Sequence, residues 1–111
     1  MPIKTVIQKL LPIYLLLTST LALASPVIWI DVRSQGEYLR EHVTGAINSP
    51  HTEITQQIAS VVPNKSSEVY LYCGSGHRAG IAKDILGAAG YTQVKNIGGI
   101  KDALAKEQSL R

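Results

Sequence analysis

The chain has 111 residues, with 11 basic and 8 acidic side chains, and this length allows a single small domain. Without Lys4 and Lys9 in the N-terminal stretch, nine basic residues face eight acidic ones, a net charge of about +1. This balance, with no basic run and no mixed basic and aromatic patch, argues against a nucleic-acid partner.

Residues 1–24 are typical of a secretory signal peptide. A short basic start precedes the apolar run Leu10–Leu21, and Ala22-Leu23-Ala24 then gives the small-x-small pattern of a signal peptidase site. The apolar run is shorter than the about 20 residues that a membrane-spanning helix needs. We therefore expect cleavage after Ala24 and a mature chain 25–111 with no stable membrane association. The alternative is an uncleaved membrane anchor.

Strand and helix patterns alternate along the first half of the mature chain. The β-branched run Val27–Val32 predicts a buried strand. Ser34 and Glu37 have the spacing of a capping box, which predicts a short helix to about Glu41. Gly45–Asn48 is a brief strand candidate.

A second helix is expected after Thr52, which is its candidate N-cap, and Pro63 should end it. Its apolar face at helical spacing consists of Ile54, Ile58, Val61 and Val62.

The second half repeats the alternation. Glu68–Tyr72 is the clearest strand, and it leads directly into Cys73. Gly90 stands where a helix C-terminus is expected, and Gln93–Ile97 predicts another strand, which Gly98-Gly99 should break. A last helix is expected over about 100–108. The apolar face of the helix before Gly90 consists of Ala82, Ile85, Leu86 and Ala89.

This alternation predicts an α/β fold, with a central parallel sheet of four to five strands flanked by helices on both faces. Ligands in such sheets bind beyond the carboxyl ends of the strands. Cys73 follows the predicted central strand, so it stands where this architecture places a site.

Cys73 is the single cysteine, and an exported chain with one thiol cannot form an internal disulfide. It opens the loop Cys-Gly-Ser-Gly-His-Arg-Ala-Gly at residues 73–80, between a strand and a helix N-terminus. Such a turn aims backbone N–H groups inward, and the helix end adds partial positive charge. These features, with the cationic Arg78 and its neighbour His77, favour a thiolate nucleophile and an oxyanion cradle. A buried, inert cysteine is the alternative, and it needs none of these features.

Cys-x-x-Gly-x-Arg at the end of a strand resembles the active-site loop of the rhodanese family. Further segments resemble that family in the same order: Asp31-Val32-Arg33, Glu37-Tyr38, His42–Pro50, Gly90-Tyr91 and Asn96–Gly99. The resemblance covers nearly all of residues 25–111. With the short length and the predicted signal peptide, the chain is most similar to the phage shock protein E type of single-domain rhodanese.

The resemblance implies a small rhodanese-like domain with thiosulfate sulfurtransferase activity. Cys73 would take a sulfane sulfur from thiosulfate or a similar small anionic donor as a persulfide, and would pass it to a thiol or to cyanide. The scheme is a double displacement that needs no metal or organic cofactor. The implied substrate-binding residues are Gly74, Ser75, Gly76, His77 and Arg78, and the relative weight of the last two is open. The implied location is the periplasm.

Asp31 and Arg33 end the first predicted strand near the site, and we expect them to shape its surroundings through an ion pair or hydrogen bonds. His42 is interpreted as structural, because an already ionised Cys73 needs no base to remove its proton.

Two other functions are alternatives to sulfur transfer. Cysteine phosphatases and arsenate reductases use a related cradle with Cys-x5-Arg spacing, whereas only four residues separate Cys73 from Arg78 here. The smaller loop favours a sulfur substituent over a phosphoryl group. A binding module or sulfur carrier with little turnover is the other alternative, and the presence of Cys73 argues against an inactive domain.

Overall fold

The computed structural model describes residues 25–111, so the predicted signal peptide lies outside the described residues. The strands are β1 (Ile28–Asp31), β2 (Ile47–Asn48), β3 (Glu68–Cys73) and β4 (Gln93–Gly99). The helices are α2 (Gln35–Arg40), α3 (Ile54–Val61), α4 (His77–Ala88) and α5 (Ile100–Ser109). The predicted alternation of strands and helices is confirmed.

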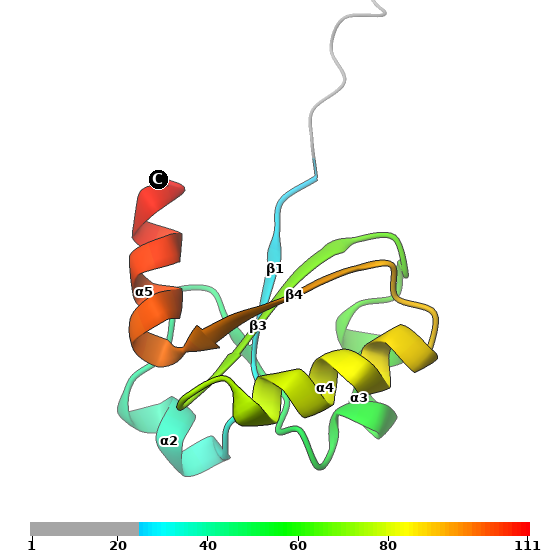
Figure 1. Ribbon diagram of the computed structural model, residues 1–111, viewed down its shortest axis with the longest axis horizontal. Coiled ribbons are helices and arrows are strands. Elements are labelled where there is room, and N and C mark those ends of the chain that lie inside the picture. The colour runs from blue at the N-terminus through cyan, green and yellow to red at the C-terminus, as the bar shows by residue number, and fades with distance from the viewer. Residues whose placement is uncertain (1–24) are drawn as a thin grey trace, which may run out of the picture.

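The strands form one parallel sheet in the order β2-β1-β3-β4. Figure 1 labels β1, β3 and β4 of this sheet. This confirms the predicted α/β class and sets the number of strands at four within the described residues. β3 lies inside the sheet, between β1 and β4. Because the strands are parallel, their carboxyl ends share one edge, and Cys73 lies at that edge in the middle of the sheet.

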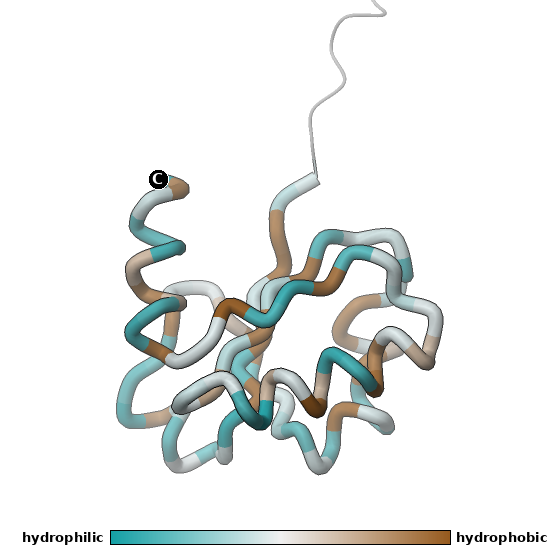
Figure 2. Tube along the Cα trace, viewed as in Figure 1, coloured by the Kyte–Doolittle hydropathy of each residue, from teal (hydrophilic) through white to brown (hydrophobic). Residues whose placement is uncertain are grey.

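Side chains of β3 alternate between the two faces of the sheet, and each face has its own apolar core. Leu71 and Cys73 belong to the core covered by α3 and α4, whereas Tyr70 and Tyr72 belong to the core on the side of α5. Trp29 packs against Tyr70 edge to face, with ring centroids 5.1 Å apart. Figure 2 shows the apolar segments along the strands at the centre of the domain. Helices therefore cover both faces, as predicted.

The local signals at two helix ends are confirmed. In α2 the Ser34 hydroxyl accepts the Glu37 N–H, and the Glu37 carboxylate accepts the Ser34 N–H, each at 3.3 Å, which completes the capping box. Gly90 follows α4 with a φ of +98°, the left-handed conformation that glycine adopts freely after a helix.

Two details of the helices were predicted wrongly. Thr52 does not cap α3: the N-cap is Glu53, with no side-chain bond, because the Glu53 N–H closes a turn onto the Pro50 carbonyl at 2.8 Å and the helix begins only at Ile54. Ala89 is exposed, because α4 ends at Ala88 and the chain turns away there.

β4 is longer than predicted because it contains a bulge. Leu71 pairs with Asn96 and Tyr72 with Gly98, so Ile97 is an extra residue on β4. Gly98 has a φ of +107°, which permits this irregularity. The strand thereby continues to Gly99, which pairs with Cys73 instead of breaking the sheet.

Candidate active site

The Cys73 sulfur lies at the N-terminus of α4, on the floor of the loop that joins β3 to this helix. The residue is 1% exposed. Its Sγ accepts the Gly76 N–H at 2.9 Å and the Ala79 N–H at 3.4 Å. Donors aimed at the sulfur, together with the positive end of the α4 dipole, stabilise negative charge on this atom.

The same loop carries further backbone donors. Within residues 25–111, the backbone N–H groups of Ser75, His77 and Arg78 donate to no protein acceptor. Ser75 and His77 are exposed, so solvent and small anions have access to this part of the loop. The arrangement suits an oxyanion or the outer sulfur of a persulfide.

Two close backbone approaches fix the loop against β4. A Cβ added to Gly99 would overlap the carbonyl oxygen of Gly74, and a Cβ added to Gly76 would lie 3.3 Å from the Gly98 Cα. Gly76 itself has a φ of +100°. Glycine is thus required here by contact and by conformation.

Arg78 forms an ion pair with Glu37 that joins α4 to α2. Its Nη1 and Nη2 donate to the two carboxylate oxygens at 2.7 and 3.0 Å. The hydrogen bonds from Arg78, followed by those from Ser34, hold the pKa of Glu37 at about 2, although partial burial opposes this shift. A Cβ added to Gly74 would lie 3.1 Å from Arg78 Nη2, so the guanidinium covers one side of the loop.

Arg78 therefore interacts electrostatically with the Glu37 carboxylate as well as with the Cys73 sulfur. Its pKa is raised chiefly by the hydrogen bonds to Glu37, and the negative charges of Glu37 and Cys73 act in the same direction. Arg78 is one of the predicted substrate-binding residues. The structure adds that Glu37 offsets part of its charge and fixes its orientation.

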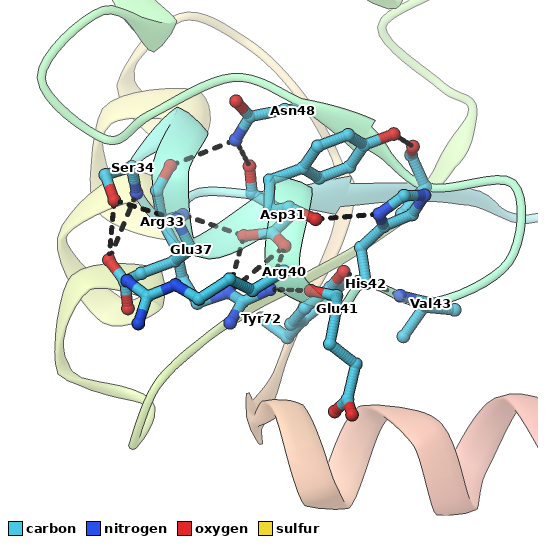
Figure 3. A network of polar contacts seen from close by, with 12 residues as sticks. Asp31, Arg33, Ser34, Glu37, Arg40, Glu41, His42, Val43, Asn48 and Tyr72 are labelled. Atoms are coloured by element: carbon cyan, nitrogen blue, oxygen red, sulfur yellow. Dashed lines mark hydrogen bonds and ion pairs between the residues drawn. The ribbon is translucent and has the colours of Figure 1, made fainter.

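Asp31 and Arg33 form the expected ion pair at the carboxyl end of β1 (Figure 3). Arg33 Nη2 donates to Asp31 at 2.7 Å, Nε donates to both carboxylate oxygens, and Nη2 also reaches the Glu41 carbonyl at 2.6 Å. The hydrogen bond with Asp31 raises the pKa of Arg33 more than burial lowers it. The pair is buried and ties β1 to the end of α2, the helix that carries Glu37.

Neighbouring groups complete this support. Asn48 Nδ2 donates to the carbonyls of Asp31 and Arg33 at 3.1 and 3.0 Å, which joins β2 to β1. The Tyr72 hydroxyl accepts the Val43 N–H at 3.0 Å, and burial raises the pKa of Tyr72 above its ordinary value.

His42 is exposed and stacks on the Tyr38 ring, with centroids 3.8 Å apart, and its Nδ1 contacts the Tyr38 carbonyl oxygen at 2.8 Å. These contacts fit a structural role.

Sequence reasoning missed three contributors to the site. Ala79 donates its N–H to the sulfur, yet its side chain carries no chemical signal. The sequence indicates Glu37 as a capping residue and as part of a family segment, but nothing in it pairs Glu37 with a residue 41 positions away. Asn96 Nδ2 donates to the Gly76 carbonyl at 2.9 Å. The family resemblance indicates the segment Asn96–Gly99 as a whole and gives Asn96 no role of its own.

Residues 25–111 contain no group of three or more His, Cys, Asp or Glu side chains placed to hold a metal ion. In the same part of the chain, no helix has the length and apolar character to cross a membrane.

Comparison with known proteins places the chain in a family. The sequence profile of the rhodanese-like domain matches residues 19–106, most of the chain. The chain belongs to the rhodanese family. The thiosulfate sulfurtransferase PspE of Escherichia coli (strain K12) is 47% identical over 91 residues, which cover 78% of this chain and 88% of that protein. The family and the general activity, sulfur transfer, are therefore those that the sequence resemblance indicated.

Other relatives and solved structures agree. Thiosulfate sulfurtransferase 18 of Arabidopsis thaliana is 33% identical, over 64% of this chain and 61% of its own. A structure described as a rhodanese with anions from E. coli superposes with a TM-score of 0.67 at 49% identity, covering 69% of this chain and 91% of that one. The rhodanese-like domain of the Alr3790 protein from Anabaena gives a TM-score of 0.65 at 27% identity, over 82% and 86% of the two chains.

Proposed function

We propose that this rhodanese moves a sulfane sulfur from thiosulfate, or a similar small anionic donor, to a thiol or cyanide acceptor through a persulfide on Cys73. The observation that carries the proposal is the pair of N–H groups, from Gly76 and Ala79, that hold the Cys73 sulfur at the N-terminus of α4. The names of PspE and of the Arabidopsis relative support thiosulfate as a donor.

In the first step the Cys73 thiolate attacks the outer sulfur of thiosulfate. A Cys73–sulfur bond forms as the bond between the two thiosulfate sulfurs breaks, and the electron pair of that bond leaves with sulfite. The negative charge of the thiolate moves to the outer sulfur of the persulfide. We assign the loop N–H groups of Ser75 and His77, which have no protein acceptor within residues 25–111, to the stabilisation of this charge.

In the second step a thiolate or cyanide attacks the outer sulfur. The persulfide S–S bond breaks, its electron pair returns to Cys73, and the enzyme recovers its thiolate. No proton is taken from Cys73 in either step, so the site needs no general base, in keeping with the structural contacts of His42.

Charge guides the donor to the loop. The side chain of His77 is exposed beside the cradle, while Arg78 lies over Gly74 and pairs with Glu37. We therefore assign His77 to attraction of the anion, and Arg78 to shaping the loop as well as to attraction. His77→Gln should raise KM for thiosulfate more than it lowers kcat, whereas Arg78→Lys, which loses the bidentate contact with Glu37, should lower kcat.

We also propose that residues 1–24 are removed during export and that the enzyme acts in the periplasm. The basic start, the apolar run and the Ala-Leu-Ala site support this. N-terminal sequencing of protein recovered from a periplasmic fraction should begin at Ser25. Recovery of the intact N-terminus from the membrane fraction would support an anchor instead.

Thiocyanate formation from thiosulfate and cyanide tests the proposed activity. Wild type should turn over with double-displacement kinetics, and Cys73→Ser should form no thiocyanate while unfolding at a similar temperature. If reduced, folded wild type forms no thiocyanate from thiosulfate and cyanide, the proposal is contradicted. Hydrolysis of p-nitrophenyl phosphate that depends on Cys73 would favour the phosphatase alternative.

A further inference from the structure

Asn96 lies at the bulge of β4, and its side-chain amide bridges this strand to the active-site loop. Nδ2 donates to the Gly76 carbonyl and Oδ1 accepts the Gly98 N–H, each at 2.9 Å. The second bond requires the amide oxygen to face Gly98, so the amide nitrogen faces Gly76. One side chain thus holds the bulge and the loop in a fixed relation.

Gly76 carries this constraint to the sulfur. Its N–H donates to Cys73 Sγ at 2.9 Å, while its carbonyl accepts from Asn96 and from the Gly80 N–H, the latter at 3.0 Å. The Gly76 carbonyl and the His77 N–H belong to one planar peptide and point in opposite directions. Anchoring the carbonyl therefore also directs the His77 N–H away from Asn96.

The first turn of α4 leaves room for Asn96 to lie across it. Gly76 and Gly80 are about one helical turn apart. A Cβ added to Gly76 would lie 3.8 Å from Asn96 Oδ1, and a Cβ added to Gly80 would lie 3.6 Å from Nδ2. Asn96 is itself exposed, so its side chain is held across this turn by hydrogen bonds and not by burial in the core.

We propose that Asn96 is a positioning residue for sulfur transfer, because its amide anchors the Gly76 carbonyl and thereby restrains the backbone of Gly76, whose N–H donates to the Cys73 sulfur. This inference rests on the proposed function. Negative charge leaves Sγ when the persulfide forms and returns when the acceptor attacks. Donors that are already oriented stabilise the returning charge without rearrangement at the moment of reaction.

Two substitutions separate the parts of this contact. Asn96→Asp keeps an acceptor for the Gly98 N–H and removes the donor to Gly76. Asn96→Ala removes both bonds and introduces no charge. Gln93→Ala is the matched control, because Gln93 begins the same strand and its amide donates to the Ser66 carbonyl at 2.7 Å.

Three measurements are made on each purified protein: the rate of Cys73 alkylation by iodoacetamide near neutral pH, kcat and KM with thiosulfate and cyanide, and the thermal unfolding midpoint. Alkylation reports on the sulfur without requiring sulfur transfer. Both Asn96 variants should lower the alkylation rate and kcat by about three- to tenfold, the loss expected for one hydrogen bond of ordinary net strength. KM should change by less than about twofold, and Gln93→Ala should match wild type.

If Asn96→Ala has the same alkylation rate and the same kcat as wild type, the inference is overturned. An equal loss in Gln93→Ala would assign the effect to a weakened β4, and a loss confined to Asn96→Asp would assign it to the added charge; either result also overturns it. If wild type forms no thiocyanate, the proposed function fails, and the alkylation rates still decide whether Asn96 positions the loop.

Discussion

Replacing Glu37 by Gln isolates the ion pair that holds Arg78 beside the loop. Gln is accepted at this position of a capping box, so the start of α2 is retained. The substitution removes the charge that Arg78 contacts at 2.7 and 3.0 Å. Arg78 keeps its charge but loses the carboxylate that faces it from α2.

The magnitude follows from the pKa of Glu37, which falls from 4.5 to about 2 in the folded protein. At about 1.4 kcal/mol for each pKa unit, the shift corresponds to an upper value of about 3 kcal/mol. The Arg78 and Glu37 side chains are 31% and 29% exposed, so solvent screens the pair. We therefore expect Glu37→Gln to lower the free energy of unfolding by about 1–2 kcal/mol at neutral pH.

The pH dependence has a definite sign. The folded pKa of Glu37 lies below its unfolded value, so this contribution is complete above the unfolded pKa and is lost as the pH falls from 4.5 towards 2. Urea unfolding of both proteins should show their difference narrowing by roughly half near about pH 3. Glu107→Gln is the control, because its partner Arg111 is 64% exposed, and it should change nothing measurable. Equal stability of wild type and Glu37→Gln at neutral pH, or a difference that does not vary with pH, would refute the reasoning.

Two further substitutions, each with a control, test the contacts that support the site. Gly99→Ala places a Cβ against the Gly74 carbonyl oxygen and should cost about 1–3 kcal/mol in thermal unfolding, with reduced thiocyanate formation. Gly36→Ala, where nothing lies within 4 Å of the added Cβ, should be neutral or slightly stabilising, and equal behaviour of the two variants would contradict the contact. Asp31→Asn removes the charge that pairs with buried Arg33 and should cost about 3 kcal/mol or more in urea unfolding. The exposed Asp84→Asn should have no such effect, and wild-type stability of Asp31→Asn would show that the pair is dispensable.

The elements of this fold could be predicted because their signals are local. The capping box of Ser34 and Glu37, the β-branched strands and Gly90 after α4 depend on neighbours within a few residues. The position of Cys73 followed from these elements, since a strand that leads into a glycine turn and a helix places its last residue at the sheet edge.

The remaining contacts depend on the assembled sheet. Glu37 meets Arg78 only because α2 and the β3–α4 loop follow neighbouring parallel strands. Asn96 reaches Gly76 because the bulge at Ile97 shifts the register of β4, and a bulge depends on how two strands pair rather than on either sequence. The cap of α3 was misplaced for a similar reason, since the turn from Pro50 to Glu53 sets where that helix begins.

The most direct test of the central claim is the intact mass of reduced protein after incubation with thiosulfate in the absence of an acceptor. Wild type should gain the mass of one sulfur atom, located on Cys73 by peptide mapping, and cyanide should remove it with formation of one equivalent of thiocyanate. Cys73→Ser should gain nothing. Wild type that stays at its original mass while releasing no sulfite, or a sulfur atom found on a residue other than Cys73, would contradict the assignment of this loop as the sulfur-transfer site.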